Sequence, residues 1–184
     1  MAAAKYLARR RHALYETMLR VNHSGELAAD RIYMGQLYSL RNDAKVAPMI
    51  QEMWNEEKRH LEYFSKQMLL QRTGRSLLTP LWDVAGTALG VVTGALGVRT
   101  AMACTVAVED TICKHYDSQI RQLIADDTEQ HRQLISDLSA IRDDEQEHHD
   151  LGLVNEAEHA FAYSLVSGII ANGCKVAIAI AQKL

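Results

Sequence analysis

The sequence predicts an all-α protein: a four-helix bundle with an additional apolar helical segment and a C-terminal helix. Apolar residues recur every three or four positions along several long stretches, and no stretch shows the alternation of a strand. Only two prolines, Pro48 and Pro80, interrupt the 184 residues, and 48% of the residues are hydrophobic. A chain of this length and composition is expected to form one domain over residues 1–184, with a substantial core.

Prolines, glycines and acidic pairs mark the expected helix ends. The four bundle helices are expected over about residues 12–41, 48–73, 99–127 and 128–151. The two further segments are the uncharged residues 84–98, in which glycine recurs, and residues 155–184.

Acidic and imidazole side chains fall in register with the apolar stripes of the four bundle helices. In chain order they form a lone Glu, a Glu-x-x-His, a second lone Glu and a second Glu-x-x-His: Glu26, Glu57, His60, Glu109, Glu145 and His148. Four-helix bundles that bind two metal ions supply their ligands in this way. A buried carboxylate is destabilising unless it is paired or bound to a metal, and two divalent cations would neutralise four carboxylates. The pattern therefore predicts a dinuclear metal site.

The alternative is that these acids pair with Arg and Lys on solvated faces, in which case several register matches would be coincidental. A third Glu-x-x-His, formed by Glu156 and His159, follows Gly152 near an expected helix start. Acidic residues there interact favourably with the helix dipole and need no metal. We therefore expect this third pair to lie outside the site.

The two apolar segments are candidates for contact with a membrane interface. Residues 84–98 are too few for the ~20 residues that span a bilayer, so a spanning helix is not expected there. Small residues favour close helix packing, and the apolar surface could lie among lipids. Ordinary core packing is the alternative interpretation of both segments.

Composition bears on nucleic-acid binding, on cysteine chemistry and on the N-terminal segment. A net charge of −3 gives no general signal for nucleic-acid binding. Three cysteines, Cys104, Cys113 and Cys174, form no C-x-x-C motif and are expected to be small core residues in a reducing compartment. Residues 1–19 form a basic lead-in, either the end of an Arg-rich mitochondrial transit segment or the basic start of a helix.

Longer strings in the chain carry a specific resemblance. They are RVNHSGE (20–26), DRIY (30–33), MWNEEKRHL (53–61), AMACTVAVE (101–109), RDDEQEHHD (142–150) and GCKVAI (173–178). Together they resemble the 5-demethoxyubiquinone hydroxylases, ferritin-like di-iron monooxygenases of ubiquinone biosynthesis. Asn22, Ser24 and Asp110 depart from residues common in eukaryotic members, and every ligand position remains filled.

The resemblance implies a ligand set and a reaction. One iron would be bound by Glu26, Glu57 and His60 and the other by Glu109, Glu145 and His148, with Glu57 and Glu145 bridging. The enzyme would hydroxylate the ring of demethoxyubiquinol with O2, with NADH as reductant, before a methyltransferase acts on the product.

The resemblance also implies a location and partners. The protein would be peripheral on the matrix side of the mitochondrial inner membrane, or on the cytoplasmic face of a bacterial inner membrane. Its partners would be the polyprenyl quinone, O2, the membrane surface, a lipid-binding protein that presents the quinone, and other enzymes of ubiquinone biosynthesis. Association into a homo-oligomer stays open.

Tyr116 and three histidines can be interpreted either as site residues or as ordinary core or surface residues, and two other function classes are alternatives. Tyr116 follows Glu109 by two helical turns and is a candidate contact for the quinone or cofactor, or else a core tyrosine with a satisfied hydroxyl. His23, His115 and His149 are candidate supports of the ligands, with solvated or core histidines as the alternative. A ferroxidase or iron-storage protein would use the same bundle without needing the apolar segments. A metal-free membrane-associated scaffold would leave the core-facing glutamates unexplained.

Overall fold

The computed structural model describes residues 2–184, with side-chain burial described from residue 5 onward. The described chain contains helices and turns but no strand. Its elements are α1 (Ala2–Leu40), α2 (Val46–Gln71), α3 (Thr79–Ala95), α4 (Val98–Asp127), α5 (Arg132–Val154), the 3₁₀ turn η1 (Ala157–His159) and α6 (Tyr163–Ala181). The prediction of an all-α protein is confirmed.

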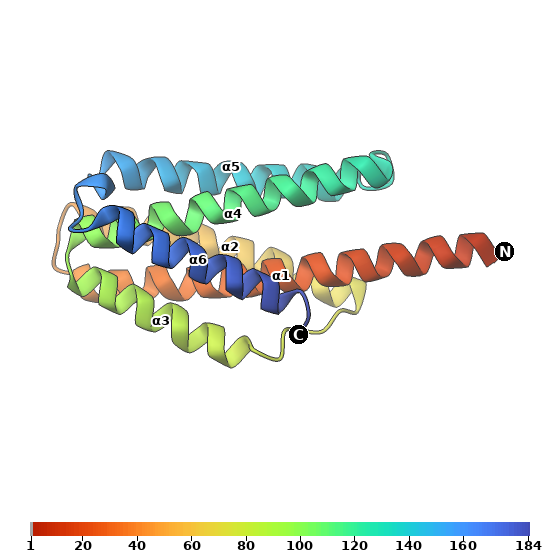
Figure 1. Cartoon of the computed structure of the whole chain (residues 1–184), viewed down its shortest axis with the longest axis horizontal. Helices are drawn as coiled ribbons and strands as arrows, with labels where there is room; N and C mark the ends of the chain where they lie inside the picture. Colours follow the sequence, from red (N-terminus) through yellow and green to blue (C-terminus); the bar gives the residue numbers. More distant parts are fainter. Residues whose placement is uncertain (1) are drawn as a thin grey trace.

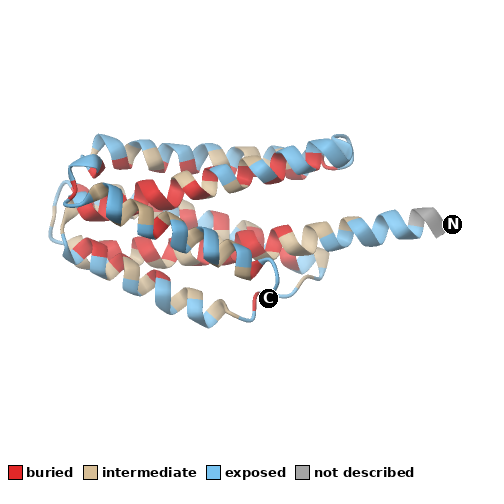
Figure 2. Cartoon of the chain, viewed as in Figure 1, coloured by how far each residue is buried: buried red, intermediate tan, exposed pale blue. Residues whose placement is uncertain are grey.

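Helices α1, α2, α4 and α5 form the bundle, and α3 and α6 lie along one side of it (Figure 1). The buried residues concentrate where the bundle helices face one another (Figure 2). Besides a third cluster that includes Ile32, Cys104 and Ile170 and joins α6 to the bundle, they form two apolar clusters at different levels of the bundle. One cluster includes Met18, Phe64, Leu123 and Leu138. The other includes Tyr33, Ile50, Met53, Met102 and Ala160. The predicted ligands occupy the sequence positions between these clusters on each helix, so the site lies in the middle of the core.

Helix α3 approaches α1 closely because glycine lines the contact. A Cβ added to Gly90 would lie 2.1 Å from the Ile32 carbonyl oxygen, and one added to Gly86 would lie 2.7 Å from the Ala28 carbonyl oxygen. Larger residues at these positions would push the helices apart. The glycine-rich composition of residues 84–98 therefore serves α1–α3 packing.

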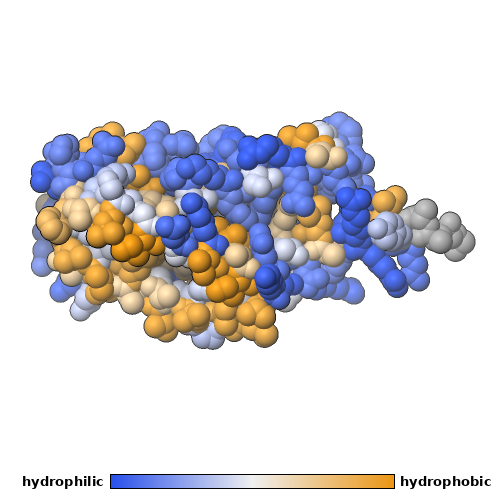
Figure 3. All heavy atoms as spheres, in the orientation of Figure 1, coloured by the Kyte–Doolittle hydropathy of each residue, from blue (hydrophilic) through white to orange (hydrophobic). Residues whose placement is uncertain are grey.

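The outward faces of α3 and α6 are apolar and exposed. Val84 and Val92 of α3 and Leu165, Ile169 and Val176 of α6 are each more than half exposed. Figure 3 shows hydrophobic atoms over this side of the molecule. By length and composition α6 could cross a membrane, and only 11% of its apolar window is buried against the rest of the chain. Core packing therefore accounts for the inner faces of these helices and not for the outer ones.

Several expected helix boundaries were wrong. Helix α1 begins at Ala2 rather than near residue 12, so the described part of the basic lead-in is helical. Helix α5 begins at Arg132 rather than residue 128, because α4 ends in a turn where Asp127 Oδ1 accepts a hydrogen bond from the Gln130 amide at 3.1 Å. Gly152 lies inside α5, where an added Cβ would lie 2.7 Å from Val106 Cγ2.

Residues 155–184 are not one continuous segment. Glu156 and Ala162 both have positive φ, at 64° and 53°, and they bracket the η1 turn before α6 begins. This left-handed backbone breaks the helical path.

Candidate metal centre

The structure brings all six predicted ligands together at the centre of the bundle. Each of the four bundle helices contributes, and every one of the six residues is at most 5% exposed: Glu26 (α1), Glu57 and His60 (α2), Glu109 (α4), Glu145 and His148 (α5). Each residue therefore lies on the core-facing stripe of its helix, as the periodicity of the sequence indicated.

The six residues form two overlapping groups, each able to surround one metal ion. The first group is Glu26, Glu57, His60 and Glu145, and the second is Glu57, Glu109, Glu145 and His148. Within each group the ligand atoms lie within 4.8 Å of one another. Glu57 and Glu145 belong to both groups, so these two carboxylates are common to the two candidate sites.

The two imidazoles turn the same atom toward the carboxylates. His60 Nδ1 lies 3.0 Å from Glu145 Oε1 and 3.6 Å from Glu26 Oε2. His148 Nδ1 lies 3.1 Å from Glu145 Oε2 and 3.2 Å from Glu57 Oε1. Both rings thus present Nδ1 to the cluster and keep Nε2 on its outer side.

Acidic residues hold the outer nitrogen of each ring. Asp144 Oδ2 of α5 lies 3.1 Å from His60 Nε2 of α2, and Glu56 Oε2 of α2 lies 2.8 Å from His148 Nε2 of α5. A carboxylate at the second nitrogen fixes the tautomer and orientation of a metal-binding histidine. The sequence reasoning missed both acids. Their signal is local, since each directly precedes a shared glutamate.

Two tyrosines hold the terminal glutamates in the same reciprocal manner. Tyr33 Oη of α1 donates a hydrogen bond to Glu109 Oε1 of α4 at 2.6 Å, and Tyr116 Oη of α4 donates to Glu26 Oε1 of α1. Each tyrosine follows the glutamate of its own helix by two turns. Tyr116 therefore contacts a predicted ligand; its contact with quinone or cofactor stays a prediction. Tyr33 was missed, although it repeats the Glu109-to-Tyr116 spacing.

The buried polar atoms of the cluster lack protein partners. Hydrogen-bond partners are missing at Glu26 Oε2, both Glu57 oxygens, Glu109 Oε2, Glu145 Oε1 and His60 Nδ1, each in a described residue of the core. Buried polar atoms without partners are rare in native proteins, and each calls for an explanation. His60 Nδ1 is unpartnered even though Glu145 Oε1 is close, because the angles are not those of a hydrogen bond. A pair of cations bound by oxygen and imidazole nitrogen would satisfy all these atoms.

Burial and charge repulsion shift the pKa values of Glu57 and Glu109. Burial raises the pKa of Glu57 well above its ordinary value, and the charge of Glu145 raises it further. Burial and then Glu145 raise the pKa of Glu109 to about 8. Protons or metal ions must therefore compensate the negative charge here, and metal ions would displace the protons on binding.

The histidines respond to the same charges. Burial lowers the pKa of His60 and His148, but close contacts outweigh this effect and raise each pKa to about 12. Those contacts are Glu145 and Glu26 for His60, and Glu145 and Glu57 for His148. Burial raises the pKa of Glu145, but the neighbouring imidazoles outweigh burial and lower it to about 2. Glu145 is thus the carboxylate most strongly held in its ionised form.

The third Glu-x-x-His lies apart from the cluster. Glu156 has left-handed backbone and forms an ion pair with Arg99, whose Nη2 lies 2.6 Å from Glu156 Oε2 on the surface. His159 ends the η1 turn and is exposed. The pair spans the η1 turn directly before α6, with Glu156 at the N-cap of that turn.

The other candidate histidines have separate surroundings. His115 Nε2 lies 2.8 Å from Gln119 Nε2, and His149 Nδ1 lies 2.9 Å from Asp150 Oδ1. His23 is buried with Nδ1 unpartnered among the described residues. The six predicted ligands instead contact acids and tyrosines. All three cysteines are free thiols, with Cys104 and Cys113 buried and Cys174 half-buried.

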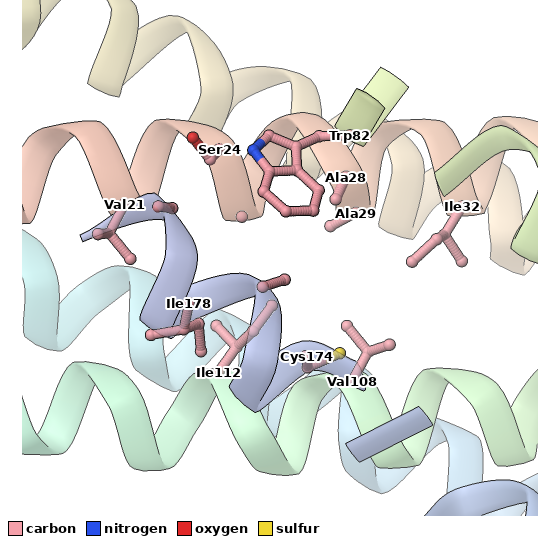
Figure 4. A pocket seen from close by; sticks show the side chains of 13 residues that line it. Val21, Ser24, Ala28, Ala29, Ile32, Trp82, Val108, Ile112, Cys174 and Ile178 are labelled. Atoms are coloured by element: carbon pink, nitrogen blue, oxygen red, sulfur yellow. The ribbon is translucent and has the colours of Figure 1, made fainter. Parts of the chain in front are cut away.

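An apolar cavity of about 80 Å³ lies beside the cluster, between α1, α3, α4 and α6 (Figure 4). Its wall includes Gly25, next to Glu26 on α1, and Val108 and Ile112, which lie on either side of Glu109 on α4. The cavity therefore lies against the segments of α1 and α4 that carry Glu26 and Glu109.

Comparison with known proteins agrees with this geometry. Residues 13–181 match the family described as "Ubiquinone biosynthesis protein COQ7". The chain is 46% identical over 172 residues to the human "NADPH-dependent 3-demethoxyubiquinone 3-hydroxylase, mitochondrial", covering 94% of this chain and 79% of the human protein.

Bacterial and fungal proteins match over similar lengths. The "3-demethoxyubiquinol 3-hydroxylase" of Rhodospirillum rubrum is 39% identical over 172 residues, and the "5-demethoxyubiquinone hydroxylase, mitochondrial" of Saccharomyces cerevisiae is 35% identical over 184 aligned positions. Each match covers 94% of this chain and 79% of the relative. With its helical fold, its buried Glu and His cluster and these matches, the chain belongs to the COQ7 family of ubiquinone biosynthesis hydroxylases.

Proposed function

We propose that this protein is a di-iron monooxygenase that hydroxylates the ring of demethoxyubiquinol with O2 in ubiquinone biosynthesis. The observation that carries the proposal is the pair of buried ligand groups that share Glu57 and Glu145. The family membership and the names of the relatives supply the reaction class and the substrate.

The two groups of residues support the ligand assignment. Glu26, Glu57 and His60 would hold one iron and Glu109, Glu145 and His148 the other, with Glu57 and Glu145 bridging. Iron bound by carboxylates and imidazoles with open coordination positions supplies the capacity to bind and reduce O2. The unpartnered oxygens of Glu26, Glu57, Glu109 and Glu145 are the atoms that support this assignment.

The surrounding residues keep these ligands in place. Tyr33 and Tyr116 each occupy one oxygen of a terminal glutamate, which leaves its second oxygen for the metal. Asp144 and Glu56 accept from the outer nitrogens of the imidazoles and so keep Nδ1 directed inward. The apolar clusters on either side exclude water, which limits side reactions of oxidised species.

We infer that the quinone ring reaches the site through the cavity between α1, α3, α4 and α6. A cavity of about 80 Å³ is smaller than the ~150 Å³ cavity that binds benzene in an engineered core, so α3 or α6 must move outward to admit a substituted ring. The shallow burial of α6 supports such a movement. The polyprenyl tail would then extend along the apolar outer faces of α3 and α6.

The exposed apolar faces support a peripheral location on a membrane. We propose the matrix side of the mitochondrial inner membrane, or the cytoplasmic face of a bacterial inner membrane; the human and yeast relatives are named mitochondrial. A lipid-binding protein that presents the quinone would cooperate at this surface, together with other enzymes of ubiquinone biosynthesis. For the reductant, the sequence resemblance implied NADH, whereas the name of the human relative specifies NADPH. We propose a reduced nicotinamide, and both forms belong in the assay.

Anaerobic loading with Fe(II), followed by O2 and a short-tailed demethoxyubiquinol, tests the proposal. We expect hydroxylated quinol as product, and continued turnover with NADH or NADPH. A ferroxidase would give ferric oxide without hydroxylated quinol, and a metal-free scaffold would bind no stoichiometric iron. Either of these results would overturn the proposed function.

A further inference from the structure

The indole nitrogen of Trp82 is a buried donor without a partner. Trp82 lies on α3 and lines the cavity between α1, α3, α4 and α6, and its Nε1 makes no hydrogen bond to any described residue. A buried indole N–H usually has a partner, and an unsatisfied donor is unfavourable. The missing acceptor must come from outside the described chain.

The rest of the cavity offers almost nothing polar. Ser24 is the other polar side chain besides the Cys174 thiol; its hydroxyl donates to the Arg20 carbonyl oxygen at 2.8 Å and makes no hydrogen bond to Trp82 Nε1. An indole N–H can only donate. The cavity therefore suits a largely apolar molecule that carries an acceptor oxygen.

The position of Trp82 relates this donor to the reaction. In Figure 4 the indole lies on the side of the cavity formed by α1 and α3, with Ile112 and Cys174 on the other side. Because Gly25 and Val108 adjoin Glu26 and Glu109 along their helices, a ring beside Trp82 lies against the segments of α1 and α4 that carry two of the predicted ligands.

We propose that Trp82 Nε1–H donates a hydrogen bond to an oxygen of the substrate ring and so determines which ring carbon faces the carboxylate cluster. This inference rests on the proposed function, because it requires the quinone ring to occupy the cavity. It makes Trp82 a substrate-binding residue that recognises ring oxygens and leaves the tail to the apolar walls.

The two tryptophans of the chain allow a direct test. Trp54 lies on α2, where its Nε1 donates to Asp30 Oδ1 at 2.7 Å, and it does not line the cavity. Trp54→Phe leaves Trp82 as the single indole of the chain. A quinone that contacts an indole quenches its fluorescence by accepting an electron from the excited state. In the resting enzyme without reductant, short-tailed demethoxyubiquinone should quench Trp82 saturably. The matched Trp82→Phe protein, which reports from Trp54, should show only weak, non-saturating quenching.

Calorimetry with two probes separates the hydrogen bond from packing. One probe is the short-tailed demethoxyubiquinone, and the other is a methylbenzene that carries the same tail but no ring oxygen. Trp82→Phe should bind the quinone about fivefold more weakly, the effect of one hydrogen bond, and bind the methylbenzene unchanged. Equal weakening of both probes would assign Trp82 a packing role only and overturn the inference.

The outcomes also separate this inference from the proposed function. Hydroxylation by Trp54→Phe with no quenching of Trp82 at saturating quinone would overturn the inference and leave the proposed function standing. Saturable quenching without hydroxylation by the iron-loaded wild-type protein would support the cavity as a quinone site and overturn the proposed function.

Discussion

Tyr33 on α1 donates a hydrogen bond to Glu109 on α4, with Tyr33 Oη and Glu109 Oε1 2.6 Å apart in the middle of the core. Tyr116 on α4 donates in the opposite direction to Glu26 on α1. This crossed pair fixes one oxygen of each terminal glutamate and leaves the other without a partner. The second oxygen is therefore positioned before any metal binds.

The first prediction concerns this preorganisation. Tyr33→Phe keeps the ring but removes the hydrogen bond to Glu109, so the glutamate is free to rotate away from the site. We expect Fe(II) affinity to fall by about 10- to 100-fold. Competition with a chromophoric chelator under anaerobic conditions measures this change. Tyr38→Phe, an exposed position on the same helix, is the matched control. Equal affinity of Tyr33→Phe and Tyr38→Phe would contradict the role given to Tyr33.

The second prediction separates binding from stability at a shared glutamate. Glu57 is fully buried with both oxygens unpartnered, and burial and Glu145 raise its pKa. Glu57→Gln should lose bound iron, while the metal-free variant should unfold at a higher temperature than the metal-free wild type. A gain of about 1 kcal/mol corresponds to roughly 2–4 °C for a chain of this size. Iron analysis and thermal unfolding of both metal-free proteins provide the measurements.

Two controls belong with this experiment. Glu145→Ala should also lose iron but gain no stability, because Glu145 contacts both His60 and His148. Glu156→Ala, in the exposed third Glu-x-x-His, should retain full iron content. Loss of iron in Glu156→Ala, or full iron in Glu57→Gln, would show that the wrong motif has been assigned.

The third prediction concerns pH. Burial, and then the charge of Arg75, lower the pKa of His23 from 6.5 to about 4. The folded protein therefore favours neutral His23. Its contribution to stability is complete above pH 6.5 and is lost as the pH falls through 4. The unfolding temperature of the wild type should fall more steeply between pH 6.5 and 4 than that of His23→Gln, as measured by circular dichroism. Parallel curves for the two proteins would exclude this contribution.

The fourth prediction concerns membrane contact. Val92→Glu and Ile169→Glu place a charge on side chains that are 55% and 65% exposed on the outer faces of α3 and α6. A charge is costly in lipid, so co-sedimentation with liposomes and turnover of long-tailed quinone should both fall. Iron content and turnover of a water-soluble short-tailed quinone should persist. Gln133→Glu, on the exposed surface of α5, is the control. If Val92→Glu and Ile169→Glu bind liposomes as well as Gln133→Glu does, the membrane interpretation is wrong.

Positions for this test must be taken from the structure. Leu89 and Ile170 belong to the same two segments, and by hydropathy alone they are as plausible as Val92 and Ile169 as lipid-facing positions. Both side chains instead pack inward, against the cluster that contains Ile32 and Cys104. Charge at Leu89 or Ile170 would test the core, because the side of a uniformly apolar helix that faces lipid cannot be read from composition.

The clustering of the six Glu and His residues was predictable because each of them shares the period of its helix. Glu57 and His60 continue the stripe that includes Met53 and Phe64, so their burial follows from the spacing. Asp144 and Glu56 were not predictable in this way. Each contacts the histidine of the opposite helix, and that partnership depends on how α2 and α5 face each other.

The helix ends were less predictable for a different reason. Gly152 resembles a helix terminator, but its lack of a side chain is used for packing against Val106 on α4. The same residue type thus serves a tertiary contact that overrides its local tendency. The break before α6 depends on left-handed backbone at Glu156 and Ala162, residue types that give no local signal for that conformation.

Anomalous diffraction at the iron edge, from crystals loaded with Fe(II), tests the central claim most directly. The account predicts two peaks per chain, one among Glu26, Glu57, His60 and Glu145 and one among Glu57, Glu109, Glu145 and His148. A single peak, or iron bound outside these six residues, would contradict it.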